Sequence, residues 1–72
     1  MKVKVSGFPD FVNKYEIKRV FSKYGTIHKI KISPEQHVAY LDMPYKLQAT
    51  TAIKELDGSK IVGRTINVEE ID

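Results

Sequence analysis

Strict alternation of polar and β-branched apolar residues is the feature that most constrains this chain. Lys2-Val3-Lys4-Val5-Ser6 alternates without exception, and Ile27–Ile32 ends the same way, with Lys29 and Lys31 alternating with Ile30 and Ile32. A period of two places one set of side chains on each face of a strand, so both segments predict strands with one buried side and one solvent-facing side. Other segments of the chain must therefore cover the apolar side.

A first helical pattern supplies part of that cover. Asn13 and Glu16 have the spacing of a capping box, in which each side chain accepts from the backbone N–H of the other residue. Apolar residues then recur on one face, at Ile17, Val20, Phe21 and Tyr24. The pattern predicts a helix over about Lys14–Tyr24, with Gly25 as its left-handed stop. In the loop before it, Gly7–Val12, we expect Phe8 and Phe11 to fold over the edge of the core.

The rest of the chain repeats these two patterns. His37–Met43 predicts a third strand after a short turn, and the alternation from Ile61 through Val68 predicts a closing strand. Between them, after Pro44, a narrow apolar stripe predicts a second helix that ends at Asp57-Gly58. The stripe consists of Ala49, Ala52, Ile53 and Leu56. The predicted order is βαββαβ.

Two amphipathic helices are buried most economically on one face of a four-stranded antiparallel sheet. Right-handed crossovers then place the first and third strands at the centre, giving the strand order 4-1-3-2 of a ferredoxin-like α+β sandwich. A chain of 72 residues allows one small domain, which we expect to span residues 1–72. The opposite face of the sheet meets solvent, and a functional site is expected at its centre.

Composition excludes several classes of function. Without cysteine the chain has no disulfides, thiolate nucleophiles or Cys-ligated metals, and His28 and His37 lie in different segments. No serine has a base and a carboxylate at suggestive positions, so we expect no enzymatic activity, metal or cofactor. Apolar runs are far shorter than the roughly 18 residues of a membrane span. We therefore expect an intracellular protein, nuclear or cytoplasmic, that is a monomer.

Charge points to the solvent-facing side of the sheet. Residues 1–32 carry eight basic and two acidic side chains, whereas residues 33–72 carry four basic and seven acidic ones. Parity directs nine residues outward: Lys2, Lys4, Lys29, Lys31, Val38, Tyr40, Thr65, Asn67 and Glu69. Tyr40 is the one aromatic residue placed outward in mid-sheet, among four lysines. Such a ring can stack on a nucleic acid base while ammonium groups neutralise phosphate.

Three segments carry a family pattern in addition to the element order: Asn13–Ile27, Ala52–Gly58 and Gly63–Val68. Together they resemble the RNA recognition motif family, and the resemblance covers nearly the whole chain. It implies a partner, single-stranded RNA, whose bases stack on aromatic residues of two motifs in the central strands.

The two motifs depart from the family pattern. In the third-strand octapeptide Gln36–Met43, Gln36 replaces a cation, Val38 replaces the first stacking aromatic residue and Tyr40 keeps the second. In the first-strand hexapeptide Val3–Phe8, Lys4 stands where the family usually carries another stacking ring. One stacking position of three is kept, so the resemblance implies weak RNA binding.

The expected RNA-binding residues are those on or beside this face: Tyr40, Lys4, Lys2, Lys29, Lys31, Val38, Gln36 and Asn67. Tyr40 stacks one base, Lys4, Lys29 and Lys31 hold the RNA backbone, and Asn67 hydrogen-bonds a base edge. The alternative is a protein-protein interaction module that kept the fold while its RNA platform was lost. The basic side of the first helix, with Lys14, Lys18, Arg19 and Lys23, is either a solubilising face or a second surface for RNA or an acidic partner.

Overall fold

The computed structural model describes residues 1–9, 11–33 and 35–71. Its elements in chain order are β1 (Lys2–Ser6), α1 (Lys14–Ser22), β2 (Lys29–Ser33), β3 (Val38–Asp42), α2 (Lys46–Leu56), β4 (Lys60–Ile61), β5 (Arg64–Thr65) and β6 (Asn67–Ile71). Among the described residues, neither helix has the length and apolar character needed to cross a membrane.

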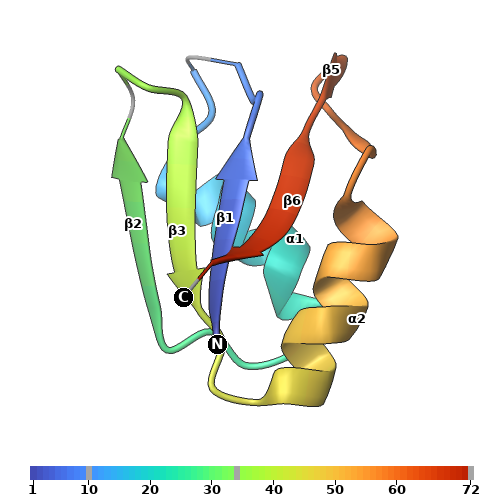
Figure 1. Ribbon diagram of the computed structural model, residues 1–72. Coiled ribbons are helices and arrows are strands. Elements are labelled where there is room, and N and C mark those ends of the chain that lie inside the picture. The colour runs from blue at the N-terminus through green and yellow to red at the C-terminus, as the bar shows by residue number, and fades with distance from the viewer. Residues whose placement is uncertain (10, 34, 72) are drawn as a thin grey trace.

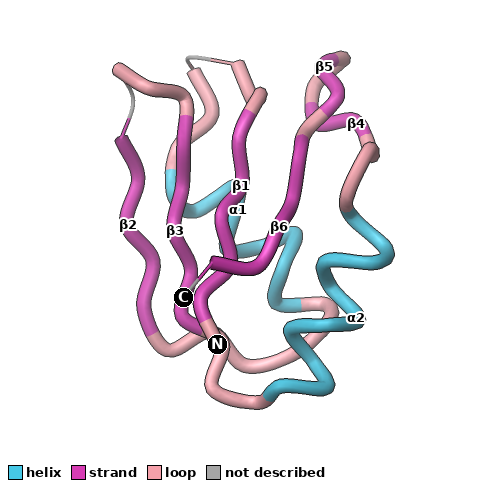
Figure 2. The backbone as a smooth tube through the Cα atoms, viewed as in Figure 1, coloured by secondary structure: helices cyan, strands magenta, loops and turns pink. Residues whose placement is uncertain are grey.

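Four strands form one antiparallel sheet in the order β2-β3-β1-β6. Figure 1 shows α1 behind this sheet and α2 along its β6 side, while the face turned toward the viewer is uncovered. The tube in Figure 2 shows the same layers, with the four long strands side by side in front. The predicted ferredoxin-like sandwich and its strand order are confirmed, with β6 as the closing strand.

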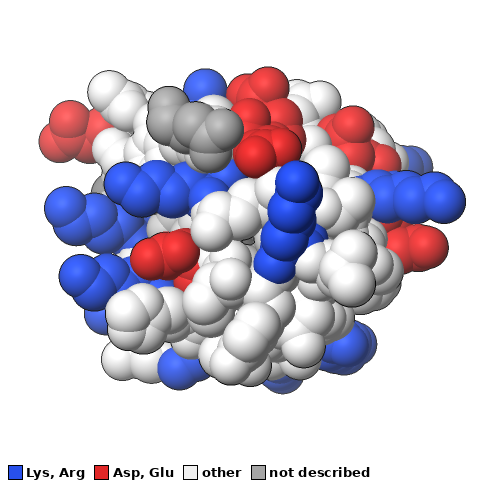
Figure 3. Space-filling model, turned by 60° about the horizontal axis from the view of Figure 1, so that its bottom comes forward, with Lys and Arg blue, Asp and Glu red and all other residues white. Residues whose placement is uncertain are grey.

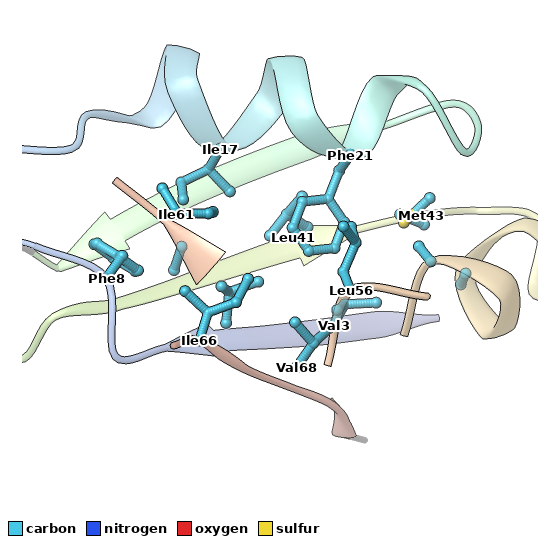
Figure 4. Close-up of a cluster of buried hydrophobic side chains, with 14 of the residues drawn as sticks. Val3, Phe8, Ile17, Phe21, Leu41, Met43, Leu56, Ile61, Ile66 and Val68 are labelled. Carbon is cyan, nitrogen blue, oxygen red and sulfur yellow. The ribbon is translucent and has the colours of Figure 1, made fainter. Parts of the chain in front are cut away.

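The core fills the space between the sheet and the two helices. Val3 and Val5 of β1 are fully buried, and Figure 4 shows Ile17 and Phe21 of α1 directed toward Leu41 of β3. The prediction that one side of β1 is buried is confirmed, because every second side chain of the strand enters this core.

The loop before α1 buries one of the two phenylalanines expected at the core edge. Phe8 is buried, but Phe11 is exposed. The Val12 N–H donates to the Pro9 carbonyl at 3.1 Å, and this turn directs Val12 into the core in place of Phe11. The prediction for Phe11 is wrong.

The start of α1 follows the predicted capping pattern in part. The Asn13 side-chain oxygen accepts from the N–H groups of Tyr15 and Glu16, at 3.0 and 3.1 Å. The Glu16 carboxylate accepts from Arg19 Nη2 at 2.9 Å, one turn further along the helix. Asn13 caps the helix as expected, whereas Glu16 is engaged within the helix.

The end of α1 differs from the prediction. The helix ends at Ser22, two residues before Tyr24, and the glycines with positive φ among the described residues are Gly7, Gly58 and Gly63. Gly25 is instead needed for space, because a Cβ there would overlap the side chain of Gln48 in α2. Gln48 Oε1 accepts from the Thr26 N–H at 2.9 Å, which draws α2 against this loop.

The predicted closing strand from Ile61 through Val68 is interrupted. The two short strands β4 and β5 pair as a hairpin whose turn consists of two residues. The sheet strand β6 follows as a separate element. Val62 and Gly63 at the tip of the hairpin have φ of 48° and 83°. A type I′ turn requires two successive residues with positive φ. This turn reverses the chain inside the segment that the alternation predicted to be one strand.

Replacing Val62 by asparagine is expected to stabilise the protein by about 1 kcal/mol, because a β-branched residue is strained at positive φ and Asn-Gly is the preferred pair for this turn. The Val62 side chain is exposed, so little burial is lost. Urea unfolding followed by circular dichroism measures the gain. Leu47→Asn, at an exposed position in α2, is the control and should bring no gain. An unfolding midpoint for Val62→Asn at or below that of the parent would contradict the assignment of strain.

Candidate nucleic-acid interface

Cross-strand pairing arranges the side chains of the open face in rows. The middle row runs from β2 to β6 through Lys31, Tyr40, Lys4 and Glu69. Directly paired residues have Cβ atoms about 4.5 to 5.5 Å apart. Tyr40 therefore lies between two lysines, as expected, and its side chain is exposed, with a relative accessibility of 37%.

A second row lies next to the first and contains Lys29, Asp42, Lys2 and Ile71. Together with Tyr40 and Lys31, these four side chains border an open hollow of about 650 Å³. Pockets for small ligands commonly measure about 300 to 1,000 Å³, so the hollow has room for a nucleobase. Lys2, Lys29, Lys31 and Tyr40 are thus brought to one place, as the sequence predicted.

The third row contains Ser33, Val38, Ser6 and Asn67. Val38 lies on the open face but is only 8% exposed, and it does not belong to the core cluster. Parity predicted its face correctly, but the exposure we expected there is wrong. Its direct cross-strand partners, Ser6 and Ser33, have short side chains, so their bulk does not account for this burial. Its contact with RNA stays a prediction, as does that of the exposed Asn67.

Gln36 is exposed in the turn that precedes β3, outside the three rows. The next residue, His37, has φ of 56°, and its Nδ1 lies 3.3 Å from the Phe8 carbonyl oxygen. The family pattern has glycine at this position, and the positive φ gives the reason, since glycine adopts it without steric cost. A role for Gln36 in RNA binding also stays a prediction.

The charges of the open face are mixed. Lys4 Nζ lies 3.9 Å from Glu69 Oε1. Asp42 lies near two nitrogens, His28 Nδ1 at 3.7 Å and the Met1 amino group at 3.9 Å. Figure 3 shows the same mixture over the lower end of the molecule, where blue basic and red acidic side chains alternate. The lysines therefore do not form one continuous basic field.

Among the open-face side chains that line the hollow, Asp42 and Ile71 were not selected from the sequence. Asp42 shares the parity of Tyr40 in its strand, so the signal was present, but no acidic residue of the face was selected as a site residue. Ile71 shares the parity of Asn67 and Glu69, and it was missed because the outward residues of the closing strand were not followed beyond Glu69.

A second basic surface lies on the helix side of the molecule. The side chains of α1 that the sequence placed outward are exposed: Lys14, Lys18, Arg19 and Lys23. Tyr15 is exposed among them, with Lys14 Nζ 5.6 Å from its ring centre. This surface and the open face belong to opposite layers of the sandwich.

Comparison with known proteins identifies similar chains. A relative, the Hrp65 protein of Chironomus tentans, is 35% identical over 57 residues, which cover 79% of this chain and 11% of the relative. The structure of the Caenorhabditis elegans NONO-1 homodimer is similar with a TM-score of 0.88 and 29% identity, over 94% of this chain and 27% of that chain. The chain thus spans only a small part of the length of either protein.

A third similarity shows the fold alone. The crystal structure of the RRM domain of Schizosaccharomyces pombe Puf1 matches with a TM-score of 0.91 and 19% identity, over 100% of this chain and 97% of that one.

The family model for the RNA recognition motif matches residues 3–67, which is most of the sequence. The chain therefore belongs to the RNA recognition motif family, a family of RNA-binding domains without catalytic activity.

Proposed function

We propose that the open face of the sheet binds single-stranded RNA weakly, with Tyr40 as its stacking platform. The observation that carries the proposal is the position of Tyr40, exposed in a central strand between Lys4 and Lys31. A stacked base contributes about 1 to 3 kcal/mol, and lysines beside it can neutralise the adjoining phosphates. Lys4, Lys29 and Lys31 hold the backbone in this arrangement, and Asn67 contacts a base edge.

The binding is weak for a reason visible on the same face. The other two stacking positions of the family hold Lys4, which faces Glu69, and Val38, which is buried. Neither offers a ring to a base. Loss of two stacks lowers the binding free energy by about 2 to 6 kcal/mol relative to a member with all three.

The alternative is a protein-interaction module. It is favoured by the absence of rings at two stacking positions and by five large apolar side chains that are exposed away from the open face: Phe11, Tyr15, Tyr45, Leu47 and Val62. Lysine-driven RNA binding falls steeply with salt, whereas a partner held by apolar contacts survives moderate salt. The experiments below separate the two.

We further propose that residues 1–72 are one folding unit, a monomer that acts in the nucleus or cytoplasm. One core cluster takes residues from both helices and from strands β1, β3 and β6, with Ile30 and Ile32 of β2 packed against it. The burial of Val38 withdraws from solvent an apolar residue of the open face that could have favoured self-association. The similar NONO-1 structure is a homodimer, and this chain covers 27% of that chain, so the oligomeric state needs the direct measurement given below.

Removing the Tyr40 ring tests the platform. Tyr40→Ala should weaken binding of a fluorescent pool of short random single-stranded RNAs by about 5- to 150-fold, the equivalent of one stacked base. Tyr40→Phe keeps the ring and should bind like the parent. Tyr15→Ala, which removes an exposed tyrosine from the helix layer, is the matched control. If Tyr40→Ala binds RNA as well as the parent, Tyr40 is not the stacking platform. If only Tyr15→Ala weakens binding, the RNA binds at α1.

The lysines give the binding a defined salt dependence. The logarithm of the binding constant should fall linearly with the logarithm of salt concentration, by about 0.7 for each phosphate contact of a single strand. Lys31→Gln should therefore reduce the slope by about that amount. Lys54→Gln, exposed on α2, should leave it unchanged. Equal slopes for the parent and Lys31→Gln would remove Lys31 from the RNA contacts.

A single folding unit should unfold in urea in one transition with the same midpoint by fluorescence and by circular dichroism, since one core joins the elements. Sedimentation equilibrium should return the mass of one chain, 8.3 kDa, across the concentrations used for binding. Two separated transitions would contradict the single unit, and a mass that rises toward that of a dimer would contradict the monomer.

A further inference from the structure

We propose that Asp42 reads the edge of the base that stacks on Tyr40 and selects guanine. The proposal rests on the proposed function, because it needs a base on the open face. It adds a preference among RNA bases, which the lysines and the stacking ring do not supply. Stacking tolerates every base, and ammonium groups contact phosphates that are the same in every nucleotide.

The position of Asp42 suits this role. It follows Tyr40 by two residues on the same face of β3, a separation of about 7 Å along a strand. Both residues line the same hollow, and of the described residues that line it Asp42 is the only acidic one. A base stacked on Tyr40 that extends along the strand therefore presents an edge to the Asp42 carboxylate.

The carboxylate is held in place but keeps accepting capacity. Its Oδ2 lies 3.7 Å from His28 Nδ1 and its Oδ1 lies 3.9 Å from the Met1 amino group, both longer than the 2.7 to 3.2 Å typical of a hydrogen bond to nitrogen. The backbone is fixed more firmly, because the Asp42 carbonyl accepts from the His28 N–H at 2.7 Å. The side chain is 35% exposed, so a ligand in the hollow can reach it.

The chemistry of the group decides which base it favours. An ionised carboxylate only accepts hydrogen bonds, and it can accept two parallel ones. The Watson–Crick edge of guanine offers N1–H and the N2 amino group side by side, next to the O6 acceptor. Adenine and cytosine offer one amino group beside an acceptor nitrogen, and uracil offers one N–H between two carbonyls that the carboxylate repels.

The residues paired with Asp42 strengthen the same preference. Lys2 and Lys29 are its neighbours on β1 and β2, and an ammonium group beside the carboxylate can donate to guanine O6. The acceptor of Asp42 and a donor from either lysine thus match the acceptor-donor-donor order of the guanine edge. Uracil has the same central N–H but carries a carbonyl where guanine has its N2 amino group, so it offers the carboxylate one donor and one repelling oxygen.

The test compares RNAs that differ in one base. Short oligouridines carry guanosine, inosine or uridine at one central position, and inosine lacks only the N2 amino group of guanosine. The parent should bind the guanosine RNA about five-fold or more tightly than the inosine RNA, and the uridine RNA least tightly, given the discrimination that a bidentate pair provides. Fluorescence anisotropy measures the three constants.

Asp42→Asn, which keeps the shape of the side chain, should reduce the guanosine-to-inosine ratio to about one, since the acceptor pair is lost. Glu69→Gln is the matched control, because it removes the same charge from another part of the open face and should raise all three affinities without changing the ratio. A ratio of one in the parent, or an unchanged ratio in Asp42→Asn with a native circular dichroism spectrum, overturns the proposal.

The two proposals fail in different ways. Binding that depends on Tyr40 but shows no guanosine preference overturns the role of Asp42 alone. Binding that is insensitive to Tyr40→Ala, or no RNA binding at all, overturns both. A purely structural Asp42, which only pairs with His28 and the Met1 amino group, predicts a change in unfolding midpoint on Asp42→Asn with no change in base preference.

Discussion

The pairing of β1 with a strand on each side is the constraint on which the rest of the structure depends. All five residues of β1 are matched in register with β3 and with β6, and Val3 and Val5 are fully buried beneath the helices. A slip of one residue would turn both valines to solvent and bring Lys4 into the core. The same backbone pairing therefore determines which side chains enter the core and which lie on the open face. A change of register would alter both sets together.

This arrangement separates stability from recognition. The side chains that hold the fold together point toward the helices, whereas Lys4, Tyr40 and Asp42 point to the opposite face. Stacking rings at the open-face positions can thus be replaced without loss of the buried contacts. The family fold is present here although Lys4 and Val38 occupy open-face positions without an aromatic ring, because the core does not need rings there. The same separation allows recognition to be probed by substitutions that leave the core intact.

Patterns with a local cause were predicted well, and features set by distant neighbours were not. Period-two alternation and helical spacing gave the sheet order, both helices and the face that carries Tyr40 and its lysines. Gly25 was assigned a left-handed turn, yet it is needed because Gln48, far along the chain, packs against it. The turn at Val62 and Gly63 lacks the Asn-Gly pair that is typical of such turns, so the alternation predicted a continuous strand there. In the candidate site, Val38 is buried although parity directs it to the open face, because parity predicts which face a side chain takes and not how much of it solvent reaches.

The contact between Lys4 and Glu69 means that the domain carries an internal competitor for part of its proposed ligand. A phosphate that reaches Lys4 releases its condensed cation, but the Glu69 carboxylate that it displaces then attracts a cation, so fewer small ions are released in total than at a lysine with no acidic neighbour. Lys4 would then add less to the salt dependence than Lys31 does, although both flank Tyr40 equally. In the proposed binding mode, the strength of RNA binding at β1 would therefore depend on two strands, through an acidic residue that need not touch RNA at all.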